Sequence, residues 1–187
     1  MVPTADQYTV RQHNTALILS TLRQNETLSR AEIAARTGLN RSTVSSIINE
    51  LLETNAIEET VLQSEKIGRP GMLLKLNPHY GFTVGIDVNV DYISTVLMDY
   101  TYAIKWQKRT PINPLHQQEA VLQQAIELTH EAINLGQSKN MKPLGIGVVV
   151  PGLVDVHHGI MIMGPNLGWQ NVPLRSLWQS HFDIPIF

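Results

Sequence analysis

The sequence contains no cysteine, few aromatic residues (6%) and no apolar run that reaches the ~20 residues of a membrane span. The lack of cysteine excludes disulfide bonds and thiolate metal sites. No basic segment followed by an apolar stretch opens the chain, so we expect no secretory signal and a cytoplasmic location. The formal net charge of −2 gives no overall attraction to nucleic acid, and any such contact depends on where individual charges lie.

Residues 29–53 have the pattern of two short helices joined by a tight turn. Ser29 and Glu32 have the spacing of a capping box, which fixes the start of the first helix. Gly38 can adopt the left-handed conformation that ends a helix, and Asn40 is suited to cap the second helix. This combination predicts a helix-turn-helix; the alternative is a helical hairpin within a bundle.

The second of these helices divides into an apolar and a polar face. The apolar residues recur at the helical period and are Val44, Ile47, Ile48, Leu51 and Leu52. The polar face has short side chains and no acidic residue before position 50, and an α-helix of this kind fits the DNA major groove. Its predicted DNA-binding residues are Arg41, Ser42, Thr43, Ser45, Ser46 and Asn49.

A β-hairpin is predicted next, from residues 57–62 and 72–76, which favour β-strands. The segment between them carries Lys66 and Arg69, and this hairpin occupies the position of the wing in a winged helix. We expect both residues to bind DNA, and Arg69 to enter a narrow minor groove, where the negative potential is enhanced. The alternative for both residues is a solvated loop. Upstream, residues 10–24 are predicted to form a helix that completes a three-helix core.

A turn-rich connector at 77–81 predicts a boundary between a first domain, 1–78, and a second, 79–187. The second domain has an α/β pattern. Strands are predicted at 82–88, 92–99, 102–109 and 144–150, with an amphipathic helix at 116–135 before the last of them. A hairpin at 154–163, a short helix at 173–181 and the start of a strand at 184–187 complete the pattern.

Five segments together resemble the ROK family of repressors and sugar kinases: residues 10–14, 28–52, 68–70, 84–88 and 145–152. Within that family the likeness is greatest to xylose repressors. The resemblance implies an α+β and α/β architecture, in which a winged helix-turn-helix precedes the first lobe of an actin-like ATPase (ROK) domain, truncated here. It also implies a sugar-responsive transcriptional repressor that binds double-stranded operator DNA as a homodimer, with xylose as the favoured inducer.

In kinases of this family, an Asp-x-Gly-Gly-Thr loop holds the phosphates of ATP. Glycine is needed there because only residues without side chains let consecutive amides close around an anion. Residues 87–91 of this chain are Asp-Val-Asn-Val-Asp, so the resemblance implies a lost ATP site. We therefore expect no enzyme activity and no cofactor; a ROK-type sugar kinase is the disfavoured alternative.

Family members continue beyond the position of Phe187 into a sugar-binding segment and a second lobe. We therefore interpret the chain as a fragment, a truncated product or half of a split protein. A further alternative follows, namely a DNA-binding remnant that senses no sugar.

Four residues are predicted by the resemblance to contact sugar: Gly152, Leu153, Asn166 and Trp169. Asn166 offers hydrogen-bond donors and an acceptor, and Trp169 offers a flat apolar surface for a sugar ring. The alternative is a turn whose Asn satisfies local backbone groups and whose Trp fills the core. His157 and His158 are expected to point to opposite faces of a strand, so no metal site is predicted.

Overall fold

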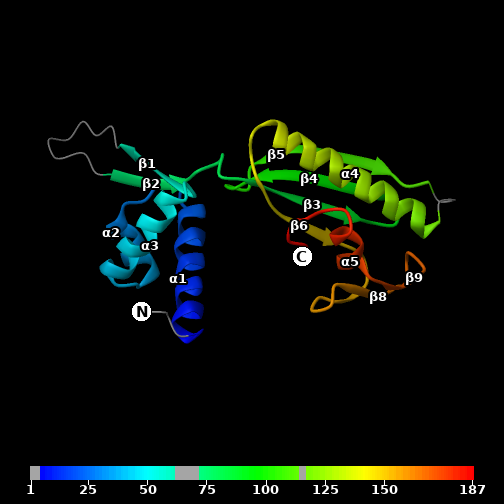
Figure 1. Ribbon diagram of the computed structural model, residues 1–187, viewed down its shortest axis with the longest axis horizontal. Coiled ribbons are helices and arrows are strands. Elements are labelled where there is room, and N and C mark those ends of the chain that lie inside the picture. Colours follow the sequence, from blue (N-terminus) through cyan, green and yellow to red (C-terminus); the bar gives the residue numbers. More distant parts are fainter. Residues whose placement is uncertain (1–4, 62–71, 114–116) are drawn as a thin grey trace. The chain divides into compact units, whose positions relative to one another are not determined.

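The computed structural model describes residues 5–61, 72–113 and 117–187. Contacts along the chain divide it into two compact units, Met1–Tyr80 and Gly81–Phe187 (Figure 1). The predicted wing residues Lys66 and Arg69 lie outside the described residues. Among the described residues, no helix combines the length and apolar character needed to cross a bilayer.

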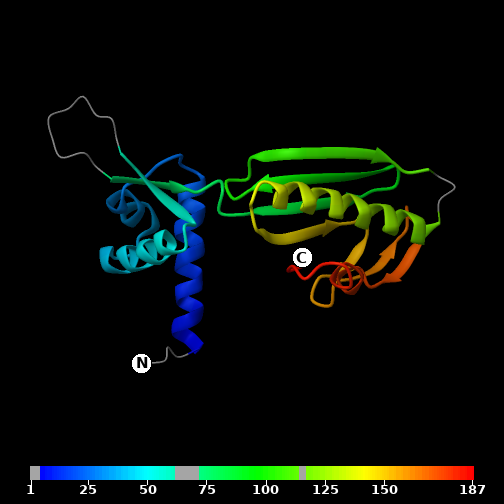
Figure 2. The same cartoon turned by 45° about the horizontal axis from the view of Figure 1, so that its top comes forward.

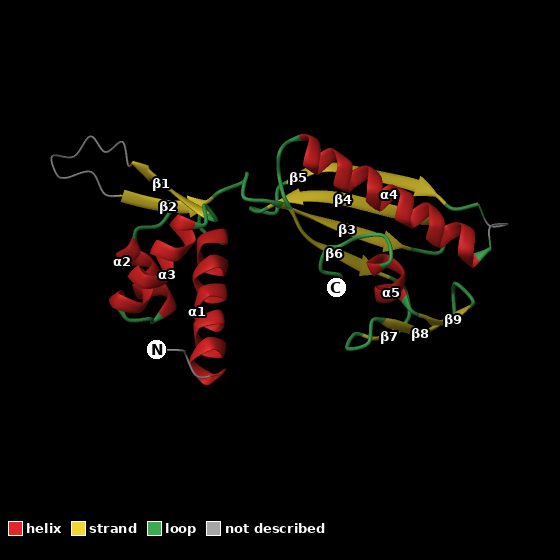
Figure 3. Ribbon diagram, viewed as in Figure 1, coloured by secondary structure: helices red, strands yellow, loops and turns green. Residues whose placement is uncertain are grey.

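The described part of the first unit contains three helices and a two-stranded antiparallel sheet (Figure 3). The elements are α1 (Ala5–Arg23), α2 (Arg30–Thr37), α3 (Arg41–Glu53), β1 (Ile57–Val61) and β2 (Met72–Leu76). Ile57 pairs with Leu76, and Leu28 forms a bridge with Leu74, which ties the segment before α2 to the hairpin. The predicted winged helix is therefore confirmed in its helices and in the paired part of its hairpin.

Helix α1 begins five residues earlier than the apolar pattern predicts. Its first turns carry exposed residues such as Tyr8 and Val10, which contribute no buried stripe and so gave no periodic signal. Its later turns bury Ile18 and Leu22 in the core of this unit. The other fully buried side chains there include Ile33, Val44, Ile47, Ile48, Ile57 and Leu74.

The predicted helix ends in the helix-turn-helix are confirmed. The Ser29 hydroxyl accepts from the Glu32 amide, and the Glu32 carboxylate accepts from the Ser29 amide at 2.8 Å, which completes the capping box. Gly38 has φ of 69°, in the left-handed region. Asn40 caps α3, because its side-chain oxygen accepts from the amide of Thr43 at 2.8 Å.

Replacing Ser29 by alanine is expected to lower the free energy of unfolding of the first unit by about 0.5–2 kcal/mol at neutral pH. Hydrogen bonds from the Ser29 side chain and amide hold the pKa of Glu32 below its usual value. A carboxylate with a lowered folded-state pKa stabilises the fold above its unfolded pKa and loses that effect as pH falls.

Chemical denaturation followed by circular dichroism at pH 7 and at about pH 3 measures this difference, since an unperturbed Glu titrates near about pH 4.3. The difference in the free energy of unfolding between wild type and Ser29→Ala should be smaller at the lower pH. A gap of constant size at both pH values would contradict the role assigned to Glu32.

The second unit is built on a four-stranded mixed sheet in the order β5-β4-β3-β6. Its elements are β3 (Phe82–Val88), β4 (Tyr92–Asp99), β5 (Ile104–Pro111), α4 (Gln118–Ser138) and β6 (Pro143–Val149). Strand β3 pairs antiparallel with β4 and parallel with β6, and α4 provides the crossover along one face of the sheet (Figure 2). The predicted order of three strands, a helix and a further strand is confirmed.

A smaller three-stranded sheet and a short helix follow: β7 (Leu153–Asp155), β8 (Ile160–Gly164), β9 (Trp169–Val172) and α5 (Leu174–Gln179). The segment predicted to start a strand at 184–187 forms a single parallel bridge, in which Ile186 pairs with Ile146 of β6. The core of this unit includes Phe82, Ile86, Ala125, Ile146, Met161 and Trp178.

Strand β5 begins two residues later than predicted. Tyr102 adopts a left-handed conformation (φ 66°) in the turn after β4, which delays the return of the chain to the sheet. The buried Asp99 carboxylate closes this turn by accepting from the amides of Thr101 and Ala103 at 2.8 and 3.1 Å. Burial acts to raise the pKa of Asp99, but Lys105 and the turn's hydrogen bonds outweigh it and lower that pKa.

Candidate DNA and sugar interfaces

Helix α3 buries its apolar face and exposes the polar one, as predicted. Val44, Ile47 and Ile48 are at most 1% exposed. The predicted contact residues lie on the other side: Arg41, Ser42, Ser46 and Asn49 are exposed, and Thr43 and Ser45 are half-buried. A helix with such an exposed polar face can present several short polar side chains to base edges at once.

In the first turn of α3, the capping side chain of Asn40 is hydrogen-bonded, whereas the Arg41 guanidinium is exposed. The side-chain oxygen of Asn40 accepts from the Ser42 hydroxyl at 2.7 Å and from the Thr43 amide, so Ser42 is held at the helix start. Within the described residues, the Arg41 guanidinium makes no hydrogen bond or ion pair. It lies beside the positive end of the helix dipole, and both features favour a contact with DNA phosphate or guanine.

Asn49, two turns later, is oriented by Arg30 of α2. Arg30 Nη1 donates to the Asn49 side-chain oxygen at 2.9 Å, and Arg30 Nη2 lies 3.7 Å from a carboxylate oxygen of Glu59 in β1. A guanidinium has donors only, so the Asn49 atom that faces it must be the oxygen. The Asn49 NH₂ group is thereby left as a donor for an acceptor on a base.

Ser46 is held from the opposite side by Arg11 of α1. Arg11 Nη2 donates to the Ser46 hydroxyl at 3.1 Å and forms an ion pair with Glu50. Arg11 thus joins α1 to α3. Sequence reasoning missed Arg30 and Glu50, since their partners lie 19 and 39 residues away along the chain.

The predicted sugar-contact residues gather around the end of β8. Leu153 pairs with Met163, and Trp169 pairs with Gly164. A Cβ atom on Gly152 would lie 2.4 Å from the Met163 carbonyl oxygen, so only glycine permits this approach of the two backbones. Gly164 is less restricted, because its Cβ would lie 1.9 Å from the end of the flexible Met161 side chain but 3.4 Å from the backbone oxygen of Pro151.

Asn166 and Trp169 have different surroundings in this region. Asn166 is exposed in the turn between β8 and β9, and its side chain makes no hydrogen bond with the rest of the described chain. Its amide is therefore available to a ligand. Trp169 is only 6% exposed and packs in the core, so it offers no open ring face here; this placement favours the core-filling alternative for that residue.

The turn between β3 and β4 takes the place of the phosphate loop. The Asn89 amide donates to the Tyr92 carbonyl oxygen at 2.9 Å, and the Val90 amide donates to the Asn89 side-chain oxygen at 2.8 Å. The Asn89 NH₂ group donates in turn to the Tyr92 hydroxyl at 3.1 Å. Amides that would need to converge on a phosphate are thus already bonded within the protein.

The two histidines do not lie on opposite faces of a strand, contrary to the expectation from the sequence. His157 and His158 lie in the turn between β7 and β8, not in a strand, and their ring centroids are 4.9 Å apart. His158 Nδ1 lies 2.7 Å from an Asp155 carboxylate oxygen. In the described parts of the chain, no three His, Asp or Glu side chains gather as metal ligands would.

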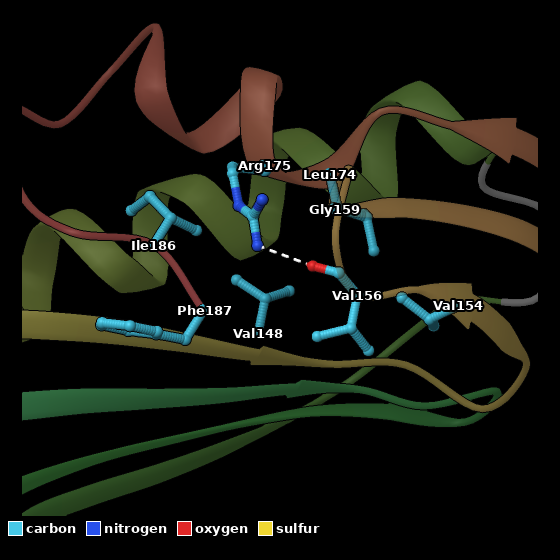
Figure 4. Close-up of a pocket in the computed structure, with 8 residues that line it drawn as sticks. All are labelled: Val148, Val154, Val156, Gly159, Leu174, Arg175, Ile186 and Phe187. Atoms are coloured by element: carbon cyan, nitrogen blue, oxygen red, sulfur yellow. Dashed lines mark hydrogen bonds between the residues drawn. The ribbon is translucent and has the colours of Figure 1, made fainter. Parts of the chain in front are cut away.

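A cavity of about 90 Å³ lies beside this turn, between β6, β7, α5 and the last residues (Figure 4). Its lining is mostly aliphatic. The one charged group, the Arg175 guanidinium, donates to the carbonyl oxygens of Val156 and His157 at 2.8 and 2.7 Å. The cavity therefore lacks the available polar groups that sugar hydroxyls need.

Comparison with known proteins gives two family matches. Residues 12–58 match a winged helix-turn-helix DNA-binding family, and residues 83–187, more than half of the chain, match the ROK family. The chain therefore combines a winged helix-turn-helix with the α/β lobe of a larger fold. It belongs to the ROK family.

Among similar curated proteins are two repressors. The chain is 35% identical over 178 residues to the putative xylose repressor of Caldicellulosiruptor sp. strain Rt8B.4, covering 95% of this chain and 45% of the relative. It is 34% identical over 185 residues to the xylose repressor of Bacillus subtilis, covering 98% of this chain and 47% of the relative. The chain thus spans about half the length of these relatives.

A similar solved structure is that of a ROK family transcriptional regulator, a homologue of the E. coli MLC protein. The TM-score is 0.74 at 21% identity, covering 95% of this chain and 45% of the other. At this level of identity, the likeness supports the fold of both units.

Proposed function

We propose that this protein is a sequence-specific DNA-binding repressor of sugar-utilisation genes in the cytoplasm, with xylose as its effector. Residues 1–78 would read the DNA and residues 79–187 would sense the sugar. The exposed polar face of α3, capped by Asn40 and backed by a buried apolar stripe, carries the DNA-binding part of this proposal. The printed names of its relatives support the choice of xylose.

In this proposal two copies of the chain bind a palindromic operator. Each α3 enters a major groove, where Arg41, Ser42 and Ser45 face bases or phosphates near the start of the helix. Asn49, whose oxygen is held by Arg30, donates its NH₂ group to an acceptor such as guanine O6 or thymine O4. Arg69 remains a predicted contact to the minor groove and Lys66 a predicted contact to DNA; both lie outside the described residues.

Sugar binding is proposed at the end of β8, where Gly152 and Leu153 meet the turn that carries Asn166. The free amide of Asn166 would bond sugar hydroxyls, and Gly152 would let its own backbone pack closely against that of β8 beside this turn. Trp169 would support this turn from the core. The sugar must bind one conformation of the protein more tightly than another, since only differential affinity shifts an equilibrium.

We propose further that the protein is not an enzyme. The turn at residues 89–91 bonds its own amides through Asn89 and Tyr92, which leaves no cradle for a nucleotide phosphate at the end of β3. The two repressor names among its relatives agree with this proposal.

Fluorescence anisotropy with a labelled duplex tests the proposal. The full chain is used to select tight-binding duplexes from a randomised pool, and the selected duplex is compared with a random one of equal length. Preferential binding of the selected duplex, weakened by xylose and not by glucose, is the expected result. Binding that ignores xylose would indicate the DNA-binding remnant, and ATP-dependent phosphorylation of xylose would indicate the kinase.

A further inference from the structure

The second half of helix α3 carries a carboxylate on its DNA-facing side. Glu50 follows Asn49 directly and lies one helical turn after Ser46, so the three side chains share one exposed face. DNA presents a phosphate charge for about every 1.7 Å of helix axis. An uncompensated carboxylate at this position would oppose the approach of Ser46 and Asn49 to the groove.

Arg11 of α1 compensates this charge in the structure. Its Nε donates to one Glu50 carboxylate oxygen at 3.3 Å, and its Nη2 pairs with the other oxygen. The same Nη2 donates to the Ser46 hydroxyl at 3.1 Å. One guanidinium therefore spans two positions a turn apart on α3, in the forked arrangement that arginine forms with carboxylates.

The pair is open to water, with the Arg11 side chain 40% exposed and the Glu50 side chain 56% exposed. Exposed ion pairs of this kind contribute little to folding stability. The contact is therefore poorly explained as a device that holds the fold together. The Arg11–Glu50 pair differs from an ordinary exposed ion pair because it lies on the polar face of α3.

We infer that Arg11 is a positioning residue for DNA binding, which acts by neutralising Glu50 and by orienting the Ser46 hydroxyl. With its oxygen accepting from Arg11, Ser46 is left to donate its proton towards an acceptor on DNA. This inference rests on the proposed DNA-binding function. It assigns to α1 a part in recognition that requires no contact between Arg11 and DNA.

A double-mutant cycle separates this role from a direct phosphate contact. The variants are Arg11→Gln, Glu50→Gln and the combination of both, measured by anisotropy on the duplex selected by the wild-type chain. Arg11→Gln should weaken binding about tenfold, because it leaves a bare carboxylate facing the phosphates. Glu50→Gln should bind at least as tightly as wild type, and the double variant should regain affinity to within about threefold of wild type.

The ion pair between Lys108 of β5 and Glu131 of α4 provides a matched control. It has a similar exposure, 45% and 46%, and lies in the second unit. Lys108→Gln removes the same charge from the chain as Arg11→Gln does. Its affinity for the duplex should stay within about twofold of wild type, which excludes an effect of net charge alone.

Salt dependence gives a second readout. Loss of a phosphate contact lowers the slope of log K against log salt by about one unit, whereas a neutralising residue leaves the slope of the double variant at the wild-type value. A double variant as weak as Arg11→Gln, or an Arg11→Gln variant that binds like wild type, would overturn the inference. So would a loss of affinity matched by a large fall in melting temperature.

The same measurements test the proposed DNA-binding function and the role of Arg11 separately. If the wild-type chain selects no duplex from the randomised pool, the proposed function is wrong and the inference falls with it. If the wild-type chain binds a selected duplex and the double variant shows no rescue, only the inference is wrong.

Discussion

Replacement of Trp178 by alanine is expected to lower the free energy of unfolding of the second unit by about 3–5 kcal/mol. Trp178 is fully buried between α5 and α4, and its indole Nε1 donates to the Thr129 hydroxyl at 3.2 Å. Thr129 is itself buried, and its hydroxyl donates to the Ala125 carbonyl oxygen at 2.8 Å. Removing the indole leaves a large cavity and also leaves the Thr129 oxygen without its donor.

Urea denaturation followed by circular dichroism measures this loss. Trp178→Phe is the matched control, because it keeps most of the apolar volume and removes only the indole donor. It should cost clearly less than the alanine variant, about 1–3 kcal/mol. Equal costs for the two variants would mean that the hydrogen bond dominates over packing, and a negligible cost for alanine would contradict the assigned core.

Replacement of Arg41 by alanine is expected to weaken binding to the selected duplex by about 1–3 kcal/mol, or about fivefold to 150-fold. Arg41 stands in the first turn of α3 with an exposed side chain that no described residue engages. If it reads guanine, the loss on random duplex should be much smaller. An equal loss on both duplexes would make Arg41 a phosphate contact.

Arg36→Ala is the matched control for Arg41. Arg36 belongs to the same unit but lies in the last turn of α2, and its guanidinium donates to the Asn25 side-chain oxygen at 2.8 Å. Its loss removes the same charge without removing a group from the exposed face of α3. A drop in selectivity for Arg36→Ala as large as that for Arg41→Ala would contradict the assignment of base reading to α3.

The helix-turn-helix was predictable because its determinants are local. The Ser29 capping box, the left-handed Gly38 and the Asn40 cap each depend on residues within a few positions, and the structure confirms all three. The order of strands and helices in the second unit was predictable for the same reason, since hydrophobic periodicity is a property of short windows.

The electrostatic environment of α3 was not predictable in this way. Arg11 and Arg30 approach the helix from α1 and α2, and no short sequence pattern specifies which cation meets Glu50 or Asn49. The close approach of Gly152 to the Met163 carbonyl oxygen also depends on the folded sheet, and no local sequence pattern indicates it. The burial of Trp169 depends likewise on how the small sheet packs. From the sequence alone, its ring could lie either on the surface or in the core.

The side-chain closure of the turn between β3 and β4 has an evolutionary consequence. Exchanging Val88 and Val90 for glycine would leave the amides of residues 89 and 90 still bonded to Tyr92 and Asn89. A nucleotide cradle would require those two partners to change as well, and each replacement made alone would loosen a hairpin without creating a binding site. A single substitution in this turn therefore creates no nucleotide site, and selection for nucleotide binding would have nothing to act on until several had accumulated.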